Sequence, residues 1–187
     1  YQELMAFGAR FQKAVQEQGL AGVMTAMTDP YRDPAEPDIT EADLGDTDRT
    51  CAIYIIGRTS GEGSDRKLAE GDYELSEKEK ENLIFLTEHY THTVVVINAG
   101  GVIDTKFLRN QKGISAIVLM SQAGCAGGRA LAEVLTGKVT PSGHLTTTWA
   151  ENYTDYPSAG TFSYLSGDVN DEYYNEGIYV GYRYFDS

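Results

Sequence analysis

Three short apolar runs, each rich in β-branched residues, constrain the fold of this 187-residue chain more than any other feature. They cover residues 53–56, 93–99 and 116–120, and each stops at a glycine-rich or polar turn. Short continuous apolar runs of this kind are typical of strands that are covered on both faces. Helical patterns separate the runs. Strands and helices in alternation predict right-handed βαβ units, and therefore an α/β fold with a mostly parallel sheet sandwiched between helices.

The helical patterns mark their ends as well as their apolar faces. Near the N-terminus, apolar residues recur at helical spacing until Gly19, which predicts an amphipathic helix that ends there. Ser76 precedes Glu79 by three residues, which is the spacing of a capping box, so we expect a second helix to begin here. The core face of this second helix consists of Leu83, Leu86 and Tyr90. Shorter helical segments are expected at residues 40–43, 105–109 and 130–135.

We expect three regions in the chain. Residues 1–49 form a helix plus an acidic, proline-rich insertion that belongs to the same domain as the rest, with an extended loop over 27–41. Residues 50–150 form the α/β-sandwich core. Residues 151–187 form an irregular aromatic tail that packs toward a neighbouring domain absent from this sequence. Two further strand-like patterns cover residues 145–149, as an edge strand, and residues 178–185.

Composition excludes several classes of function. The net charge of −13 opposes binding to nucleic acid, because the phosphate backbone would be repelled. No apolar run approaches the length of a membrane span, and no signal-peptide pattern opens the chain. Cys51 and Cys125 are too few for a disulfide scaffold, so we expect two reduced thiols, which favours a cytoplasmic protein over a secreted one. The chain starts at Tyr1 within a helical pattern, and we expect it to be a piece of a longer protein.

The first strand runs directly into a glycine-rich loop with a carboxylate at its tip. Gly61 and Gly63 flank Glu62, so the backbone can turn tightly and approach a ligand closely. The carboxyl ends of parallel strands are where open α/β sheets usually bind ligands. A carboxyl group covered there by a ligand or another domain is pushed toward its neutral form, as a general acid requires. The alternative is a solvated turn with a charged tip, and spacing alone does not decide between them.

Other chemistries find less support in the residues. The glycine loop lacks the third glycine of a dinucleotide fingerprint and the lysine of a P-loop, so no nucleotide cofactor is expected. The turn at 124–128 opens a helix and is a better anion site, although a compact strand-to-helix turn explains it equally simply. The three histidines form no metal-binding spacing, and no serine lies on a G-x-S-x-G elbow. We expect neither a metal nor another cofactor.

Four segments, in order along the chain, resemble glycoside hydrolase family three. They read GRTSGEGSDR, VVVINAGG, AIVLMSQAGCAGGRALAEVLTGKVTPSGHLTTTW and YNEGIYVGYRYFD. The likeness is to the second, α/β-sandwich domain of the family's β-glucosidases, and it runs from about Thr50 to the end. The resemblance implies an (α/β)6-sandwich-like fold that is incomplete at its N-terminus, because the first strand of the sandwich has no counterpart here.

The resemblance also implies a function. Such enzymes are retaining exo-glycosidases that release a terminal, non-reducing β-D-glucosyl residue, and their substrates are β-linked glucosides or short oligosaccharides. A carboxylate nucleophile and an acid/base carboxyl group flank the bond. In the family the nucleophile is an aspartate on a separate (β/α)-barrel domain, the partner that this chain lacks. The glutamate of the SGEG loop falls on Glu62, which becomes the acid/base. The candidates for substrate binding around it are Arg58, Ser60, Asp65 and Arg66.

Two alternatives stay open at this point. The chain could be a non-catalytic carbohydrate-binding or packing module in which Glu62 bonds only a hydroxyl group. It could also belong to a β-xylosidase of the same family, since sugar choice rests on barrel residues. One segment departs from the family pattern. The turn at 123–128 keeps its glycines but lacks the family's polar side chains, which puts a role for that turn in binding the leaving group in doubt.

Overall fold

The computed structural model describes residues 2–28, 36–45, 48–58, 65–168, 170–171 and 173–186. The chain forms two compact units, Tyr1–Pro37 and Asp38–Ser187. The division of the chain into residues 1–49, 50–150 and 151–187 stays a prediction. No helix in the described ranges combines the length and the apolar character that crossing a bilayer requires.

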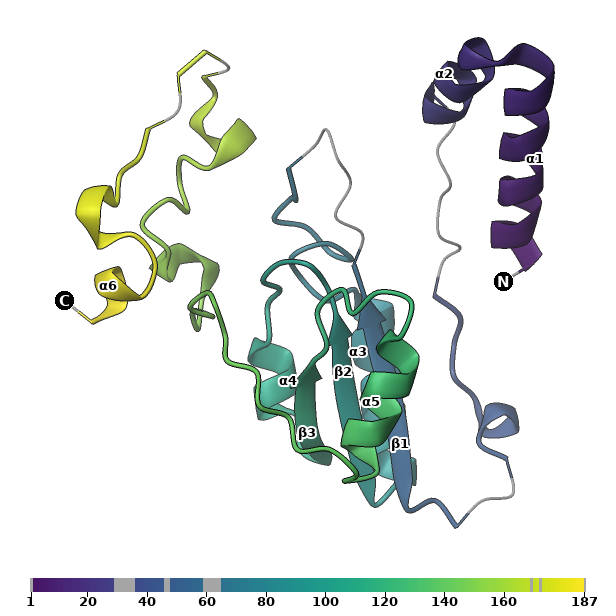
Figure 1. Ribbon diagram of the computed structural model, residues 1–187. Coiled ribbons are helices and arrows are strands. Elements are labelled where there is room, and N and C mark those ends of the chain that lie inside the picture. The colour runs from purple at the N-terminus through teal and green to yellow at the C-terminus, as the bar shows by residue number, and fades with distance from the viewer. Residues whose placement is uncertain are drawn as a thin grey trace. The chain divides into compact units, whose positions relative to one another are not determined.

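The first unit is a pair of helices, drawn in purple in Figure 1. Helix α1 spans Gln2–Gln18 and helix α2 spans Leu20–Thr28. Gly19, at φ +57°, turns the chain between them, which confirms the predicted helix end. The expected loop over 27–41 was wrong at its start, because α2 continues to Thr28. Gly22 allows the two helices to pack closely. A Cβ at this position would lie 2.1 Å from the carbonyl oxygen of Ala14.

The second unit contains a parallel sheet in the order β1-β2-β3. Residue Ile53 pairs with Val94, and Val94 pairs with Ala116, so the three strands stand in one register with an irregularity at Thr93/Val94. The sequence prediction of an α/β fold with a parallel sheet is confirmed. The elements are β1 (Cys51–Gly57), α3 (Glu77–His89), β2 (His92–Asn98), α4 (Lys106–Asn110), β3 (Ile114–Leu119) and α5 (Gly127–Leu135).

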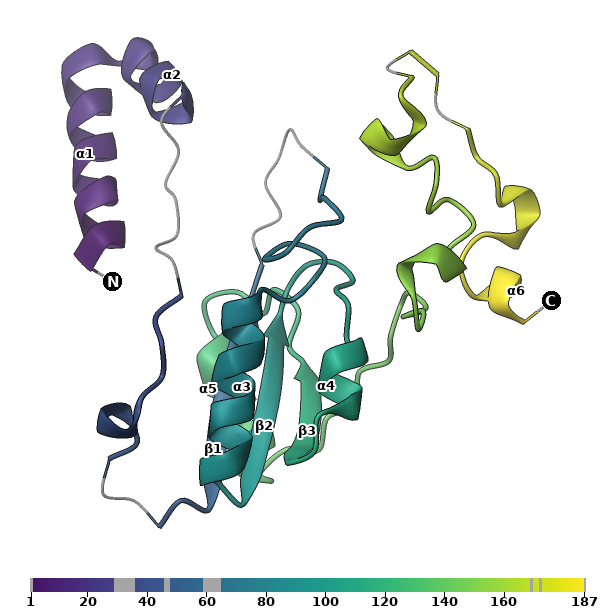
Figure 2. The same ribbon diagram turned by 180° about the vertical axis from the view of Figure 1, so that it is seen from behind.

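Helices cover both faces of this sheet. Figure 1 shows α5 in front of the strands, and Figure 2, seen from behind, shows α3 and α4 on the opposite face. The main core lies on the side of α3 and α4. It consists of buried residues from the strands, these helices and the connecting loops, including Ile56, Leu75, Leu83, Ile97, Ile103 and Leu108.

The prediction that residues 53–56 are covered on both faces was wrong. Burial alternates along β1: Tyr54 and Ile56 are buried toward α3, whereas Ile53 and Ile55 are 52% and 55% exposed on the other face. The reason is that β1 is an edge strand of the described sheet, and among the described helices of this unit the nine-residue α5 is the one that lies on that face. A short helix cannot shield three strands.

Two further predicted strands are not formed. Residues 145–149 form no strand. At their end the hydroxyl of Tyr156 bonds the backbone instead: it donates to the Thr148 carbonyl at 3.1 Å and accepts from the Ala150 N–H at 2.9 Å. Residues 178–185 are helical instead, with a 3₁₀ turn at Gly177–Tyr179 and α6 at Tyr182–Phe185. Gly181, at φ +66°, breaks the extended path between them.

Candidate functional site

The candidate site lies at the carboxyl edge of the sheet, where the segment after β1 begins. Glu62 and Ser60 fall in residues 59–64, which lie outside the described residues. The residues that hold both ends of this segment are described. Arg58 directly follows β1 on one side, and the described chain continues at Asp65 and Arg66 on the other.

Arg58 is fixed by a complete set of hydrogen bonds. Its guanidinium donates two bonds to the Glu79 carboxylate, Nη1 to Oε1 at 2.6 Å and Nη2 to Oε2 at 2.8 Å. The other three N–H groups donate to the carbonyl oxygens of Gly57, Asp72 and Glu74. A guanidinium has five N–H donors, so none is left for a ligand. Arg58 therefore positions the base of the segment, and this geometry does not favour direct contact with a sugar.

Glu79 links this anchor to the start of α3. The predicted capping box is confirmed: the Glu79 N–H donates to Ser76 Oγ at 3.1 Å, and the Ser76 N–H donates to Glu79 Oε2 at 2.8 Å. The side chains of Arg58 and Glu79 are only 5% and 6% exposed, so the ion pair is buried. One carboxylate thus caps a helix and holds the end of β1.

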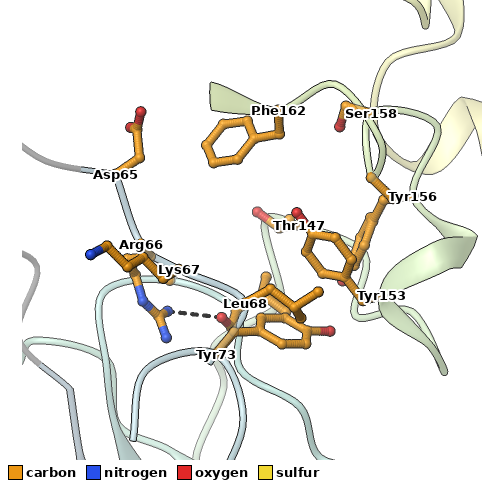
Figure 3. A pocket seen from close by; sticks show the side chains of 13 residues that line it. Asp65, Arg66, Lys67, Leu68, Tyr73, Thr147, Tyr153, Tyr156, Ser158 and Phe162 are labelled. Atoms are coloured by element: carbon orange, nitrogen blue, oxygen red, sulfur yellow. Dashed lines mark hydrogen bonds between the residues drawn. The ribbon is translucent and has the colours of Figure 1, made fainter. Parts of the chain in front are cut away.

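Arg66 anchors the other end with fewer hydrogen bonds to the described residues. Its Nε donates to Asp72 Oδ1 at 2.6 Å, and its Nη atoms donate to the carbonyl oxygens of Val102 and Asp72. These bonds use three of five N–H groups. Asp72 also accepts from the Lys67 N–H at 2.6 Å, which fixes the backbone where the chain resumes. Asp65 makes no hydrogen bond with the described residues, and Figure 3 shows its carboxylate pointing away from Arg66.

A pocket of about 540 Å³ opens beside these residues. Figure 3 shows Tyr73, Tyr153 and Tyr156 grouped on one side of the opening and Phe162 across from them. The charged residues of the rim come from the chain that follows the Glu62 segment. They are Asp65, Arg66 and Lys67. Backbone from the turn after β2, at Gly101 and Val102, closes the floor.

The aromatic wall is packed edge to face. The ring centroids of Tyr73 and Tyr153 lie 5.1 Å apart at an interplanar angle of 72°, and those of Tyr153 and Tyr156 lie 6.3 Å apart. Burial raises the pKa of the Tyr73 hydroxyl, and the nearby Tyr156 and Asp104 add to the rise. Tyr73 therefore stays a neutral phenol and can donate a hydrogen bond at any physiological pH.

A smaller cavity of about 170 Å³ adjoins the ends of β2 and β3. His144, Thr147 and Trp149 line it together with the turn at Gly100 and Gly101. Sequence reasoning missed the aromatic residues of the larger pocket. The sequence signal for Tyr153, Tyr156 and Phe162 was the density of aromatic residues after Asn152, which had no period and so did not show which way these side chains point; Tyr73 had no such signal.

Two further possibilities from the sequence were the turn at 124–128, as an anion site, and a metal site, which the histidine spacing does not support. The turn at 124–128 is compact, with Gly124 at φ +69° and a bond from the Gly127 N–H to the Gly124 carbonyl, and it leads into α5. Among the described residues, no group of three histidine, cysteine or acidic side chains lies close enough to hold a metal ion.

The fold is an α/β domain with a parallel sheet. At the carboxyl edge of this sheet, where such sheets bind ligands, lie the fixed residues Arg58 and Arg66 and the aromatic pocket. Comparison with known proteins identifies the family. The model of the glycosyl hydrolase family 3 C-terminal domain matches residues 4–182, so the chain belongs to this family. This confirms the resemblance drawn from the sequence.

Several relatives of this chain are β-glucosidases. β-Glucosidase A of Butyrivibrio fibrisolvens is 36% identical over 95% of the chain, and a β-glucosidase of Ruminococcus albus is 40% identical over 73%. A solved β-glucosidase structure from Paenibacillus barengoltzii superposes with a TM-score of 0.76 at 33% identity, and covers 92% of the chain. The chain spans only 23%, 14% and 20% of the lengths of these three proteins.

Proposed function

We propose that this chain is the part of a retaining exo-β-glycosidase that supplies the general acid/base, Glu62, to a sugar pocket on a barrel domain. The substrates are terminal, non-reducing β-D-glucosyl residues of glucosides or short oligosaccharides. Membership of family 3 and the β-glucosidase names of the relatives support the substrate class.

One observation carries the proposal beyond family membership. Both ends of the segment that bears Glu62 are fixed at the carboxyl edge of the sheet, by Arg58 on one side and by Arg66 with Asp72 on the other. The backbone spans at most about 3.6 Å per residue, so the Cα of Glu62 lies within about 14 Å of that of Arg58 and about 11 Å of that of Asp65. These limits keep Glu62 near the carboxyl edge of the sheet, where open α/β sheets bind ligands.

Each residue then has a role in the reaction. In retaining hydrolysis Glu62 protonates the glycosidic oxygen as the bond to the leaving group breaks, and the nucleophile of the barrel takes the sugar. Glu62 then removes a proton from the water that releases the sugar. Arg58 acts by positioning, because all its donors are used within the protein. Ser60 and Asp65 remain candidates for contact with the substrate, as does Arg66 through the two N–H groups that bond none of the described residues.

The test uses the complete enzyme with the Glu62→Ala substitution. A substrate with a poor leaving group, such as cellobiose, needs protonation and should lose about 10²–10⁴-fold in kcat/KM. An aryl glucoside with an acidic phenol needs little help to leave, so its glycosylation rate should fall much less. Glu88→Ala removes an exposed carboxylate on α3 and serves as the matched control.

The two outcomes separate the proposal from its alternative. If Glu62 only bonds a hydroxyl group of the sugar, both substrates lose a similar, modest factor and the leaving group makes no difference. If cellobiose hydrolysis survives the substitution, Glu62 is not the acid. A parallel series of β-xylosides and β-glucosides decides the sugar.

A further inference from the structure

We infer that residues 38–45 form a strap along α3 that is docked more firmly when His89 is protonated, so that the strap is a pH-sensitive latch. The strap leads from the first unit toward β1. Its side-chain contacts with α3 begin at the first turn of the helix, where Lys78 pairs with Asp38, and end at His89, the last helical residue. The inference does not depend on the proposed function.

Two apolar side chains dock the strap on the main core. Leu44 is 3% exposed and belongs to the buried cluster, and Ile39 packs against that cluster. Hydrogen bonds fix the backbone at the same two places. The Ile39 N–H donates to Asn82 Oδ1 at 2.9 Å, and the Tyr90 hydroxyl donates to the Leu44 carbonyl oxygen at 3.2 Å. The strap is therefore held on α3 on both sides of Glu41.

His89 meets the strap between these two places. Its Nε2 lies 2.7 Å from Glu41 Oε1, and its Nδ1 lies 2.7 Å from the carbonyl oxygen of Phe85. The Phe85 ring stacks on the imidazole with centroids 4.1 Å apart, which holds the plane of the imidazole. Each ring nitrogen thus faces an oxygen acceptor, and only the protonated ring can donate a hydrogen bond to both.

Loss of the proton turns one of these contacts into a contact between two acceptors. The Phe85 carbonyl belongs to the backbone of α3 and cannot move away. We therefore expect Nδ1 to keep its proton and Nε2 to present its lone pair to the Glu41 carboxylate. The Glu41 side chain is 68% exposed, so the strap is the partner that can move. Deprotonation thus weakens the docking of the strap at its middle.

The groups around His89 give the direction of the effect. The bond to the Phe85 carbonyl raises the pKa of His89 above its usual 6.5, and the bond to Glu41 adds to the rise. Arg49, whose Nη1 lies 3.7 Å from Glu41 Oε2, opposes it. A pKa that is higher in the docked state gives stabilisation that is complete below pH 6.5 and is lost as the pH rises through the raised pKa.

Hydrogen exchange in the complete enzyme, at pH 5.5 and at pH 8.5, tests the latch. We measure protection factors, which correct for the intrinsic pH dependence of exchange, at the Ile39 amide and at the amides of β2. The Ile39 amide reports docking of the strap through its bond to Asn82, and β2 reports unfolding of the whole domain. We expect protection of Ile39 to fall about threefold more than that of β2 at the higher pH, since an exposed charged contact is weak.

Two substitutions separate the latch from a general effect of pH. His89→Gln removes the titrating group, so the difference between Ile39 and β2 should no longer change with pH. Glu41→Gln places an amide opposite His89 that can donate to the neutral ring, so the loss at pH 8.5 should disappear. His92→Gln is the matched control, because His92 bonds Ser115 on β3, and it should behave as the wild type.

Three results would overturn the inference. The first is a protection of the Ile39 amide in the wild type that does not fall with pH. The second is a fall shared equally by β2, because the strap would then open only with the whole domain. The third is a fall that His89→Gln leaves unchanged, because a different group would then control the strap.

Discussion

The two arginines on either side of residues 59–64 are alike in sequence but differ in what they do. Arg58 is 5% exposed and spends all five N–H donors on Glu79 and three carbonyl oxygens. Arg66 is 22% exposed, spends three, and lines the pocket. The strand side of the segment is thus built for rigidity, and the other side is built to meet a ligand. The same residue type on both sides of a segment therefore does not imply a shared role.

The largest expected effect is on stability, and it comes from Arg58. Arg58→Met leaves the Glu79 carboxylate buried without its partner, so we expect the free energy of unfolding to fall by about 3–5 kcal/mol. Urea unfolding of the chain measures it. Lys80→Met breaks the exposed pair with Glu77 and should cost about 0.5 kcal/mol. If Arg58→Met costs no more than this control, the strand side is not the rigid one.

A smaller effect on stability is expected at Arg66. Its pair with Asp72 is partly exposed, so Arg66→Met should lower the free energy of unfolding by only about 1 kcal/mol. In the complete enzyme the same variant should raise KM for cellobiose more than for methyl glucoside, because the N–H groups of Arg66 at the rim of the pocket are lost. A loss of stability equal to that of Arg58→Met, with no change in KM, would remove the distinction between the two arginines.

The smallest effect concerns a charged contact at the far end of α3. His89 Nδ1 lies 2.7 Å from the Phe85 carbonyl oxygen, and Nε2 lies 2.7 Å from Glu41 Oε1. The two oxygens are acceptors, so only a doubly protonated imidazolium ring can donate a hydrogen bond to each of them. The bond to Phe85 and then the bond to Glu41 raise the pKa of His89 above 6.5, while Arg49 opposes the rise.

The sign of the pH dependence follows from that rise in pKa. A folded-state pKa above the unfolded value gives stabilisation that is complete below pH 6.5 and is lost as the pH rises through the folded pKa. The difference in Tm between wild type and His89→Gln should therefore shrink from pH 5.5 to pH 8.5. In the Glu41→Gln background, the Tm difference caused by His89→Gln should change less with pH. A difference that grows with pH would contradict the protonated contact.

Local features of the fold were predictable from the sequence, and long-range ones were not. The capping box joins Ser76 and Glu79, which are three positions apart, and it formed as expected. The second role of Glu79, as partner of Arg58, joins residues 21 apart and leaves no local pattern. In the same way, the predicted strand at 145–149 is absent, and the hydroxyl of Tyr156 bonds the backbone there, eight and six residues before it.

The candidate site divides along the same line. The segment with Glu62 was found because glycines flank a carboxylate directly after a strand. The pocket was missed because Tyr73 and Phe162 lie 89 positions apart in sequence and meet only through the fold. Burial along β1 was also misjudged, since Ile53 and Ile55 have the same character as Tyr54 and Ile56 and only the packing of α3 and α5 tells them apart.

The most direct measurement of the central claim is the product that Glu62→Ala forms in the complete enzyme when sodium azide is present. Without its acid/base the enzyme still forms the glycosyl intermediate from an activated aryl glucoside, but water reacts slowly because nothing removes its proton. Azide needs no base. We predict faster turnover with azide and β-glucosyl azide as the product, since the second displacement restores the original configuration. If azide neither speeds the variant nor yields this product, Glu62 is not the acid/base.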